Sequence, residues 1–349
     1  MTIRDVALAS GVSTATVSRV LNGDASVSAA TALKVRDEVE RLGYTMNWAA
    51  RSLKKGSTRT VGVIAPELAS DFFMLLAESM DRELSGAGYS LIVCSSWESA
   101  DEEAKRMRLL AGRLVDGLVV IPATGSGEGI SAAMADGRHA SPLVLVDRLA
   151  PGVAADAVLV DNEGGAYAAT AALAAEGIAQ GRGRMGFIGG GLGLSIARER
   201  YEGWRRAMSD SGLEVEPRFT SFSGLHVASG YESLRAMRSC PDAPDAYFLA
   251  NAYIHVGATN YLVSEESAAR SAGVAFAAFD EMPWSPLLRF CRYSLSQPVA
   301  EMGALAARIL LSRILGESSA PPETARLPVS LIRHDHIPQG EKKWQTFPA

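Results

Sequence analysis

The chain has 349 residues, of which 48% are hydrophobic and 21% charged, and its formal net charge is −5. These values are typical of a globular protein with two or three domains, and they exclude a disordered chain, collagen and a coiled coil. No run of about 18 apolar residues is present, and the first residues lack the apolar stretch of a secretion signal. We therefore expect a cytoplasmic protein without a membrane partner. Three scattered cysteines indicate neither a disulfide framework nor a zinc cluster.

The first sixty residues are basic although the whole chain is acidic. They contain nine Lys or Arg and five Asp or Glu, a net +4, which leaves −9 for the remainder. Local charge, rather than the charge of the whole chain, sets the electric field where a protein meets phosphate. The division is typical of a protein that touches nucleic acid with one end, although a +4 surface is common in other proteins.

Three short helices are predicted at the N-terminus. Thr2 starts a capping box for a helix that ends at Gly11, and Ser13 begins a second helix. Apolar residues at positions 17, 20 and 21 have helical spacing and must face a core. A third helix starts at Ser28 and stops at Gly43. A helix, a glycine turn and a second helix with a small-residue outer face predict a helix-turn-helix, whose second helix enters the major groove. The alternative is a helical bundle with solvated Ser and Thr caps.

From residue 60 onward, short runs rich in Val, Leu and Ile alternate with segments of helix length. This alternation predicts parallel strands joined by crossover helices. Parallel sheets of this kind bind ligands beyond the carboxyl ends of their strands. The expected strands are residues 60–65, 90–95, 117–122, 143–147 and 158–160, then 185–189, 247–251 and 275–280.

Motifs along nearly the whole chain resemble the LacI/GalR family of bacterial transcription regulators. The matching segments are residues 2–7, 11–22, 27–28, 42–44, 50–53, 61–64 and 115–117. The resemblance implies an all-α helix-turn-helix head over 1–45, a hinge helix or linker over 46–59 and an effector-binding core over 60–349. The core is expected to be an α/β fold of two doubly wound parallel-sheet lobes, like a periplasmic binding protein. Lobe one is expected at about 60–160 and 292–322, and lobe two at about 161–291 and 323–340.

The resemblance also implies which residues meet DNA. Thr14 and Ala15 match the positions that set sequence preference, and Arg19 is suited to bidentate contact with guanine. Residues expected to hold phosphate are Thr2, Thr16, Ser18 and Asn22. In the linker, Leu53 matches a leucine that wedges between base pairs, and basic residues beside it are Arg51 and Lys54. Met46 stands where relatives usually carry proline, so the linker is expected to be less ordered before it binds DNA.

The expected effector site is assembled from the ends of strands. Phe72 and Phe73 match a family loop that stacks on the effector, although such a pair is more often part of a core. Arg200 matches an arginine that contacts ligand hydroxyls or carboxylate. Asn251 and Asp280 match two later strand ends. The remaining candidates are Ser70, Asp147 and Trp284, of which Asp147 is equally consistent with a structural cap.

Aromatic faces beside Asp, Asn and Arg are typical of a sugar site, because CH patches stack while hydroxyls need polar partners. A sugar or sugar derivative is therefore the first interpretation, and a nucleobase or nucleoside is the alternative. Leu194 and Ile196 stand where relatives often present hydroxyls. Their presence predicts an unusually apolar pocket.

Enzyme motifs are incomplete. The glycine-rich segment 189–194 lacks the third glycine of a dinucleotide fingerprint, and His334 and His336 lack further metal ligands. We expect no catalytic residues, no cofactor and no metal. The predicted function is a repressor that binds a pseudo-palindromic double-stranded DNA operator as a homodimer, with tetramer formation left open, under the control of a small-molecule effector. A solute-binding protein without DNA binding and a sugar-processing enzyme are the alternatives.

Overall fold

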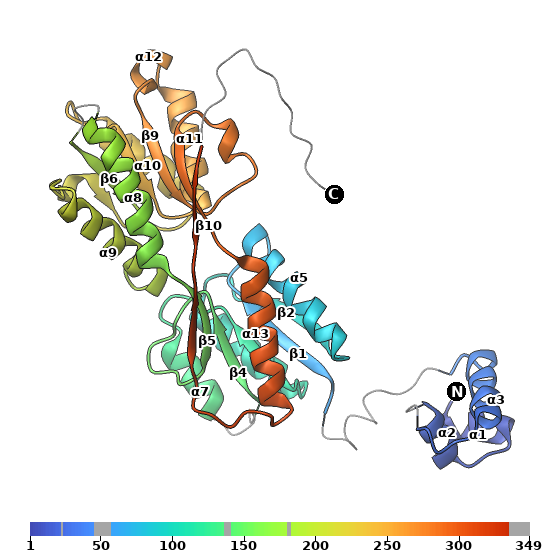
Figure 1. The fold of residues 1–349 in the computed structure, drawn as a ribbon. Coiled ribbons are helices and arrows are strands. Elements are labelled where there is room, and N and C mark those ends of the chain that lie inside the picture. Colours follow the sequence, from blue (N-terminus) through green and yellow to red (C-terminus); the bar gives the residue numbers. More distant parts are fainter. Residues whose placement is uncertain (22–23, 45–56, 136–140, 180–182, 335–349) are drawn as a thin grey trace. The chain divides into compact units, whose positions relative to one another are not determined.

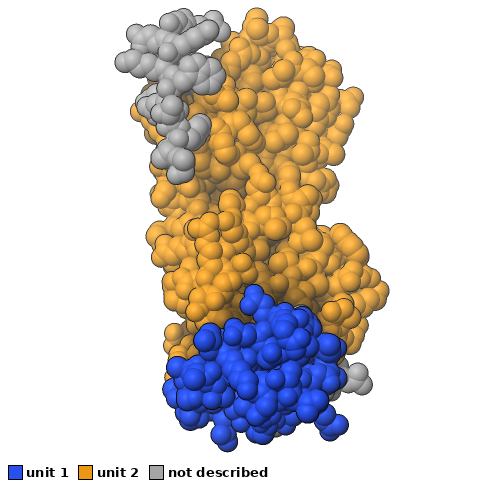
Figure 2. Space-filling view, turned by 90° about the vertical axis from the view of Figure 1, so that its right-hand side faces the viewer, with its two compact units in different colours: residues 1–58 blue, residues 59–349 orange. Residues whose placement is uncertain are grey.

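The computed structural model describes residues 1–21, 24–44, 57–135, 141–179 and 183–334. The chain forms two compact units, Met1–Thr58 and Arg59–Ala349, which Figure 2 shows in different colours. The first unit is helical, and the second contains two α/β lobes (Figure 1). This is the fold class that the sequence predicted. No helix in the described part of the chain has both the length and the apolar character needed to cross a membrane.

The described residues of the first unit form three helices around a small aliphatic core. They are α1 (Ile3–Ser10), α2 (Thr14–Leu21) and α3 (Ala29–Arg41), at the predicted positions. Gly11 ends α1 with a φ of 64°, a left-handed conformation that glycine adopts at little steric cost. The hydroxyl oxygens of Ser13 and Ser28 accept hydrogen bonds from the third backbone N–H after each, and so cap α2 and α3. The buried core residues are Val6, Ala7, Val17, Val20 and Val35.

Lobe one of the second unit is a six-stranded parallel sheet with helices on its faces. The strand order is β11-β5-β4-β3-β1-β2. The strands are β1 (Thr60–Ala65), β2 (Ser90–Ser95), β3 (Gly117–Val120), β4 (Leu143–Val146), β5 (Asp156–Val160) and β11 (Thr324–Leu327). The helices are α5 (Asp71–Gly86), α6 (Ala100–Gly112), α7 (Gly127–Ala135) and α13 (Val299–Ile314).

Lobe two repeats this plan with the order β12-β10-β9-β8-β6-β7. Its strands are β6 (Met185–Ile188), β7 (Thr220–Ser221), β8 (Ala246–Leu249), β9 (Ala275–Phe279), β10 (Cys291–Ser296) and β12 (Ser330–Arg333), and β12 alone among them runs antiparallel, to β10. Its helices are α8 (Asn162–Ala179), α9 (Ser195–Asp210), α10 (Val227–Arg238), α11 (Ala252–Glu265) and α12 (Ala268–Ser271). Single 3-10 turns are η1 (Pro217–Phe219) and η2 (Ser285–Leu287).

Matching positions in the two sheet orders identify equivalent strands. In particular, β4 of lobe one and β9 of lobe two both lie third in their sheets, after the strand pairs β11-β5 and β12-β10. The chain passes between the lobes after β5, after β10 and between β11 and β12, as Figure 1 shows. We call these three crossing segments the hinge, because connections between two lobes are the positions that absorb a relative movement of the lobes.

The predicted lobe boundaries are wrong at two places. Residues 292–296 belong to β10 in the sheet of lobe two, not to lobe one, and residues 324–327 form β11 in the sheet of lobe one, not of lobe two. The physical reason is that burial and alternation show that a segment is a strand but do not show which sheet it pairs with. All eight predicted strands are present to within two residues at each end, whereas β7, β10, β11 and β12 were not predicted.

The two lobes fill their cores with different side chains. The largest fully buried side chains of lobe two are aromatic: Trp204, Tyr247, Phe187, Phe219, Phe248, Phe276 and Phe279. Those of lobe one are aliphatic: Ile64, Leu76, Met80, Leu84 and Met107. The helices of lobe two also approach closely, because a Cβ atom at Gly257 of α11 would lie 1.9 Å from the carbonyl oxygen of Val227 at the start of α10.

Candidate functional sites

The second helix of the first unit turns a short polar face outward. Val17 and Val20 are buried, whereas Thr14, Ala15 and Arg19 are exposed. Thr2 is exposed at the start of α1, and Thr16 and Ser18 are half-buried beside the exposed face. Small side chains with one arginine allow a helix to approach base edges closely. The remaining predicted DNA contacts lie outside the described residues: Asn22, Arg51, Leu53 and Lys54.

The end of the predicted linker is attached to lobe one. The backbone N–H of Arg59 donates to Oδ2 of Asp116 at 2.9 Å, and its Nη1 donates to the carbonyl oxygen of Ala87 at 3.1 Å. The guanidinium also lies over the ring of Tyr89, 5.5 Å from the centroid. Residue 59 is therefore held to lobe one through both its backbone and its side chain.

All eight predicted effector-binding residues line one cavity in the second unit. It has a volume of about 1480 Å³ and is lined by residues of both lobes. The eight residues are Ser70, Phe72, Phe73, Asp147, Arg200, Asn251, Asp280 and Trp284. Ligand sites commonly measure roughly 300 to 1000 Å³, so the cavity has room for a ligand of one or more sugar rings. The apolar residues Leu194 and Ile196 also line the cavity, as expected from the prediction that they make the pocket more apolar.

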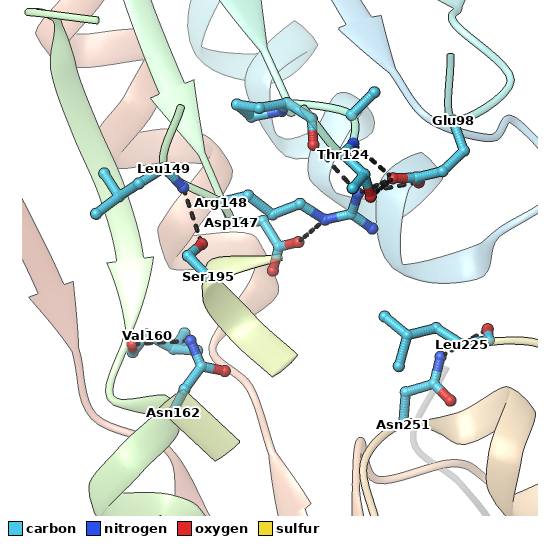
Figure 3. Close-up of polar contacts among 12 residues, drawn as sticks. Glu98, Thr124, Asp147, Arg148, Leu149, Val160, Asn162, Ser195, Leu225 and Asn251 are labelled. Carbon is cyan, nitrogen blue, oxygen red and sulfur yellow. Dashed lines mark hydrogen bonds and ion pairs between the residues drawn. The ribbon is translucent and has the colours of Figure 1, made fainter. Parts of the chain in front are cut away.

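The lobe-one wall contains an ion pair that the sequence did not predict. Nη1 of Arg148 donates to both carboxylate oxygens of Glu98, at 2.7 and 2.9 Å, and to the carbonyl oxygen of Pro122. The backbone N–H and hydroxyl of Thr124 donate to Oε1 of the same Glu98. Figure 3 shows these side chains converging from the loops that follow β2, β3 and β4. The cluster therefore joins three strand ends of lobe one.

Asp147 follows β4 in a conformation that few non-glycine residues adopt. Its φ is 67°, and the residue is 3% exposed. Its Oδ2 lies 3.4 Å from Nε of Arg148. Burial raises the pKa of Asp147, and the positive charges of Arg148 and Arg200 oppose that rise. Left-handed backbone at a buried carboxylate is the kind of local strain that accumulates at binding sites.

Asp280 follows β9, the equivalent strand of lobe two, and is also left-handed, with a φ of 75°. Its carboxylate is better satisfied than that of Asp147. Nε2 of Gln297 donates to Oδ1 at 2.6 Å, and the backbone N–H of Ala252 donates to Oδ2 at 3.1 Å. Gln297 follows β10, so this bond ties the end of β9 to a crossing between the lobes.

Asn251 acts as the cap of α11. Its Oδ1 accepts from the backbone N–H of Ile254 at 2.9 Å. Its Nδ2 donates to the carbonyl oxygen of Leu225 at 3.1 Å, a bond that Figure 3 shows. Both the oxygen and the nitrogen of the side-chain amide are therefore hydrogen-bonded within lobe two. Its predicted contact with a ligand stays a prediction, and the residue also has this structural role.

Arg200 is buried at the centre of a hydrogen-bond chain. Its Nε donates to Oδ1 of Asn162 at 2.8 Å, and its Nη1 donates to the carbonyl oxygen of Ala250 at 2.6 Å. Its Cζ lies 3.6 Å from the centroid of the Phe279 ring. Burial lowers the pKa of Arg200, and the negative charges of Asp280 and Asp147 oppose this.

The hydrogen-bond chain that begins at Arg200 continues from Asn162 to Arg326. Nδ2 of Asn162 donates to Oε2 of Glu199 at 3.0 Å, and both terminal nitrogens of Arg326 on β11 donate to the same carboxylate, at 2.8 and 3.2 Å. Arg326 belongs to lobe one and Glu199 to lobe two, while Asn162 lies at the first crossing. A side chain that lines the cavity is therefore connected to two of the three crossings.

Aromatic rings complete the cavity. Phe72 and Phe73 meet edge to face with centroids 5.3 Å apart, and both are half-buried against the core as well as lining the cavity. Trp284 lies 5.0 Å from the ring of His255. His255 is fully buried, neither of its ring nitrogens has a hydrogen-bond partner among the described residues, and burial lowers its pKa to about 3.

Several cavity residues were missed because only some of the strand ends were considered. Glu98 and Thr124 follow β2 and β3, Arg148 follows Asp147 directly, and Gln297 follows β10. The rule that ligands lie beyond the carboxyl ends of parallel strands, applied to every predicted strand, would have indicated the first three. Gln297 depended on recognising β10.

Comparison with known families decides the classification. A family described as "Periplasmic binding proteins and sugar binding domain of LacI family" matches residues 58–289, and "Bacterial regulatory proteins, lacI family" matches residues 2–47. The chain belongs to the LacI family. It is accordingly a DNA-binding transcriptional regulator with a helix-turn-helix head and a periplasmic-binding-protein-like core.

Individual relatives are distant but cover nearly the full length. The transcriptional repressor PurR of Haemophilus influenzae strain PittEE is 27% identical over 94% of this chain and 96% of its own. Catabolite control protein A of Priestia megaterium is 28% identical over 94% and 96%. Both are similar in sequence to this LacI-family chain from the head to the end of the core.

Solved structures agree with this classification. The complex of the transcriptional regulator CelR with cellobiose is 28% identical, with a TM-score of 0.68 over 95% of this chain and 98% of that chain. The lac repressor bound to ONPG in the repressed state has a TM-score of 0.81 over the same shares but is 23% identical, so it supports the fold alone. Among the described residues, no group of three or more His, Cys, Asp or Glu side chains is arranged to hold a metal ion.

Proposed function

We propose that this LacI-family regulator represses transcription by binding a pseudo-palindromic operator as a homodimer, and that a small ligand in the interlobe cavity controls its affinity for DNA. The observation that carries the proposal is the convergence of eight predicted residues on one cavity. The hydrogen-bond chain from Arg200 to Arg326 supports control by that cavity, because it links the lining to the hinge.

A polyhydroxylated ligand, a sugar or a sugar derivative, is the proposed effector. The lining combines aromatic faces with carboxylate, amide and guanidinium groups, which is the mixture that stacks on CH patches and pairs with hydroxyls. CelR, similar in sequence and fold, was solved with cellobiose. The Phe72–Phe73 pair also suits a flat base, so a nucleobase or nucleoside is the second candidate. In both cases the cavity binds its ligand without catalysing a reaction on it.

Control requires that the ligand prefer one arrangement of the lobes. Closure around a ligand moves the crossings and, through Arg59, the end of the linker. A coupling of about 1 to 3 kcal/mol between ligand and operator is typical of allosteric proteins. The sign, induction or corepression, follows from which arrangement orders the linker.

Operator binding is tested by gel shift and footprinting over a salt series. We expect two symmetric half-sites and a steep loss of affinity with salt, because phosphate contacts release counterions. Arg19→Ala is expected to cost about 1 to 3 kcal/mol at the operator and to relax preference at one base pair. Arg41→Ala, which removes an exposed arginine paired with Glu38 on α3, is the matched control and should leave sequence preference unchanged. Equal loss on operator and random DNA for Arg19→Ala would contradict its role in base reading.

Effector binding is tested by thermal shift with a panel of sugars and nucleosides. A ligand that binds only the native protein raises the melting temperature. A ligand that raises it and also changes operator affinity supports the proposal. Absence of any DNA preference at low ionic strength, with or without such ligands, would refute it.

A further inference from the structure

The charges around the cavity are strongly unequal. Seven carboxylates line it, against two guanidinium groups, those of Arg148 and Arg200. Arg82 and His334 pair with two of the carboxylates, Glu78 and Glu281, from outside the lining. Even when both are counted as positive, an excess of three negative charges remains. The cavity therefore has a field that attracts cations and repels anions.

The two guanidinium groups of the lining are already engaged by acceptors of the protein. Arg148 donates to Glu98 and to a backbone carbonyl, and Arg200 donates to Asn162 and to another backbone carbonyl. A sugar phosphate or a sugar acid would usually be bound by such forks of donors. Here those bonds would have to be broken first, so the lining disfavours an anionic ligand.

Unlike these two guanidinium groups, the buried carboxylate of Asp147 is able to form further hydrogen bonds, as an acceptor. Its side chain is 4% exposed, and its closest basic neighbour is Nε of Arg148 at 3.4 Å from Oδ2. None of the described residues donates a hydrogen bond to its other oxygen, which Figure 3 shows turned away from Arg148. A carboxylate that lines a cavity and has only one distant donor gains free energy from a ligand that donates to its other oxygen.

Aromatic rings line the same cavity. Phe72, Phe73, Tyr253 and Trp284 line the cavity, and the negative charges of Glu67 and Asp71 act on Tyr253. The negative face of an aromatic ring attracts a cation, and rings placed among carboxylates are typical of sites that recognise ammonium groups. This observation is independent of the hydrogen bonding of Asp147 and indicates the same ligand charge.

We propose that the effector carries a protonated amine, as an amino sugar does, and that the Asp147 carboxylate binds this amine. The inference deepens the proposed function and rests on it, since it assigns the chemical class of the ligand in the same cavity. Hydroxyls of the sugar then meet the remaining polar groups of the lining. A neutral sugar of the same shape binds more weakly, and a sugar acid or sugar phosphate does not bind.

Titration calorimetry with the full-length protein tests the charge preference. The probes are matched sets on two scaffolds: glucosamine, glucose and glucuronate, and galactosamine, galactose and galacturonate. We expect at least one amine to bind about tenfold or more tightly than its neutral counterpart, because hydrogen bonds to charged groups are stronger. No binding is expected for the acids. Tighter binding of a neutral sugar or of an acid overturns the proposal, and so does the absence of binding by both amines.

Two variants separate the role of Asp147 from a general effect of charge. Asp147→Asn keeps a side chain that tolerates left-handed backbone, so the fold is retained, and it should reduce the amine preference to less than about twofold. Asp81→Asn removes an exposed carboxylate of α5 that does not line the cavity, and it should leave the preference unchanged. An amine preference that survives in Asp147→Asn overturns the assignment to this residue.

Failure of this inference is distinguishable from failure of the proposed function. Operator affinity without ligand is measured on the same preparations. One outcome is that the protein binds the operator and that a neutral sugar, but neither amine, alters the affinity for the operator. In that case the proposed function holds and the inference of an amine effector is wrong. If no operator is bound, the proposed function itself fails.

Discussion

The two lobes of the core share one strand order, yet they hold equivalent residues differently. Asp147 and Asp280 follow equivalent strands and have nearly the same left-handed φ, 67° and 75°. Asp280 receives donors from Gln297 and Ala252, whereas Asp147 has one distant neighbour, Nε of Arg148. An equivalent position can thus be a structural joint in one lobe and an open acceptor in the other. Strand order alone does not distinguish them.

The two lobes also differ in the side chains that fill their cores and in how their strand ends are held. Lobe two is packed with large aromatic side chains, and its strand end is tied to a crossing between the lobes. Lobe one is aliphatic, and its strand ends are joined through the Glu98–Arg148 ion pair. Four predictions test the comparison.

The largest effect is expected from Asp280→Ala. The substitution leaves two donors, of Gln297 and Ala252, without their acceptor and places alanine in a left-handed conformation. We expect the free energy of unfolding to fall by about 3 kcal/mol, measured by urea denaturation. Asp147→Ala places alanine in the same left-handed conformation but removes only a distant pair, so it should cost less, about 1 to 2 kcal/mol. Equal losses for the two variants would remove the distinction between the lobes.

Glu103 of lobe one supplies a pH-dependent effect. It is fully buried on α6, its Oε2 accepts from the backbone N–H of Ala123, and burial raises its pKa from 4.5 to about 7. The native protein therefore holds this proton more tightly than the unfolded chain, so the contribution to stability is lost as pH rises from about 4.5 through 7. Glu103→Gln should be more stable than wild type by about 2 kcal/mol at pH 8 and similar at pH 4.5. Parallel stability curves over this range would contradict the prediction.

His255 of lobe two should show the opposite dependence on pH. Burial lowers its pKa from 6.5 to about 3. Between these pH values the unfolded chain binds a proton at His255 and the native protein does not. The contribution to stability is then lost as pH falls below 6.5. His255→Met, which fills the space without unpaired nitrogens, should gain about 1 kcal/mol at pH 7 and more at pH 5. Thermal denaturation at both pH values is the measurement, and a variant less stable than wild type at pH 5 would refute it.

The smallest effect on stability is expected at the hinge. Arg326 on β11 binds Glu199 of α9 with a half-exposed ion pair, which is worth less than about 1 kcal/mol. Arg326→Met should therefore change the melting temperature little. The same variant should alter the effect of ligand on operator affinity several-fold, because it cuts the chain between Arg200 and the crossing. Unchanged coupling would show that the two lobes communicate through other contacts.

Much of the architecture was already determined by the sequence. Helical spacing of Val17 and Val20, serine caps and the left-handed Gly11 depend on neighbours within a few residues, so local pattern predicted α1, α2 and α3. Strands such as β1 and β4 were equally clear as short apolar runs. Motif resemblance then placed eight residues that line one cavity.

Only the tertiary structure decided how those residues are used. Which sheet receives β10 and β11 depends on pairing between distant segments, which local pattern does not encode. The Glu98–Arg148 pair and the chain from Arg200 to Arg326 join residues 50 and more than 100 positions apart. The difference between Asp147 and Asp280 likewise follows from the donors that folding brings to each carboxylate, because a side chain's type fixes what it can bind but its neighbours decide what remains free.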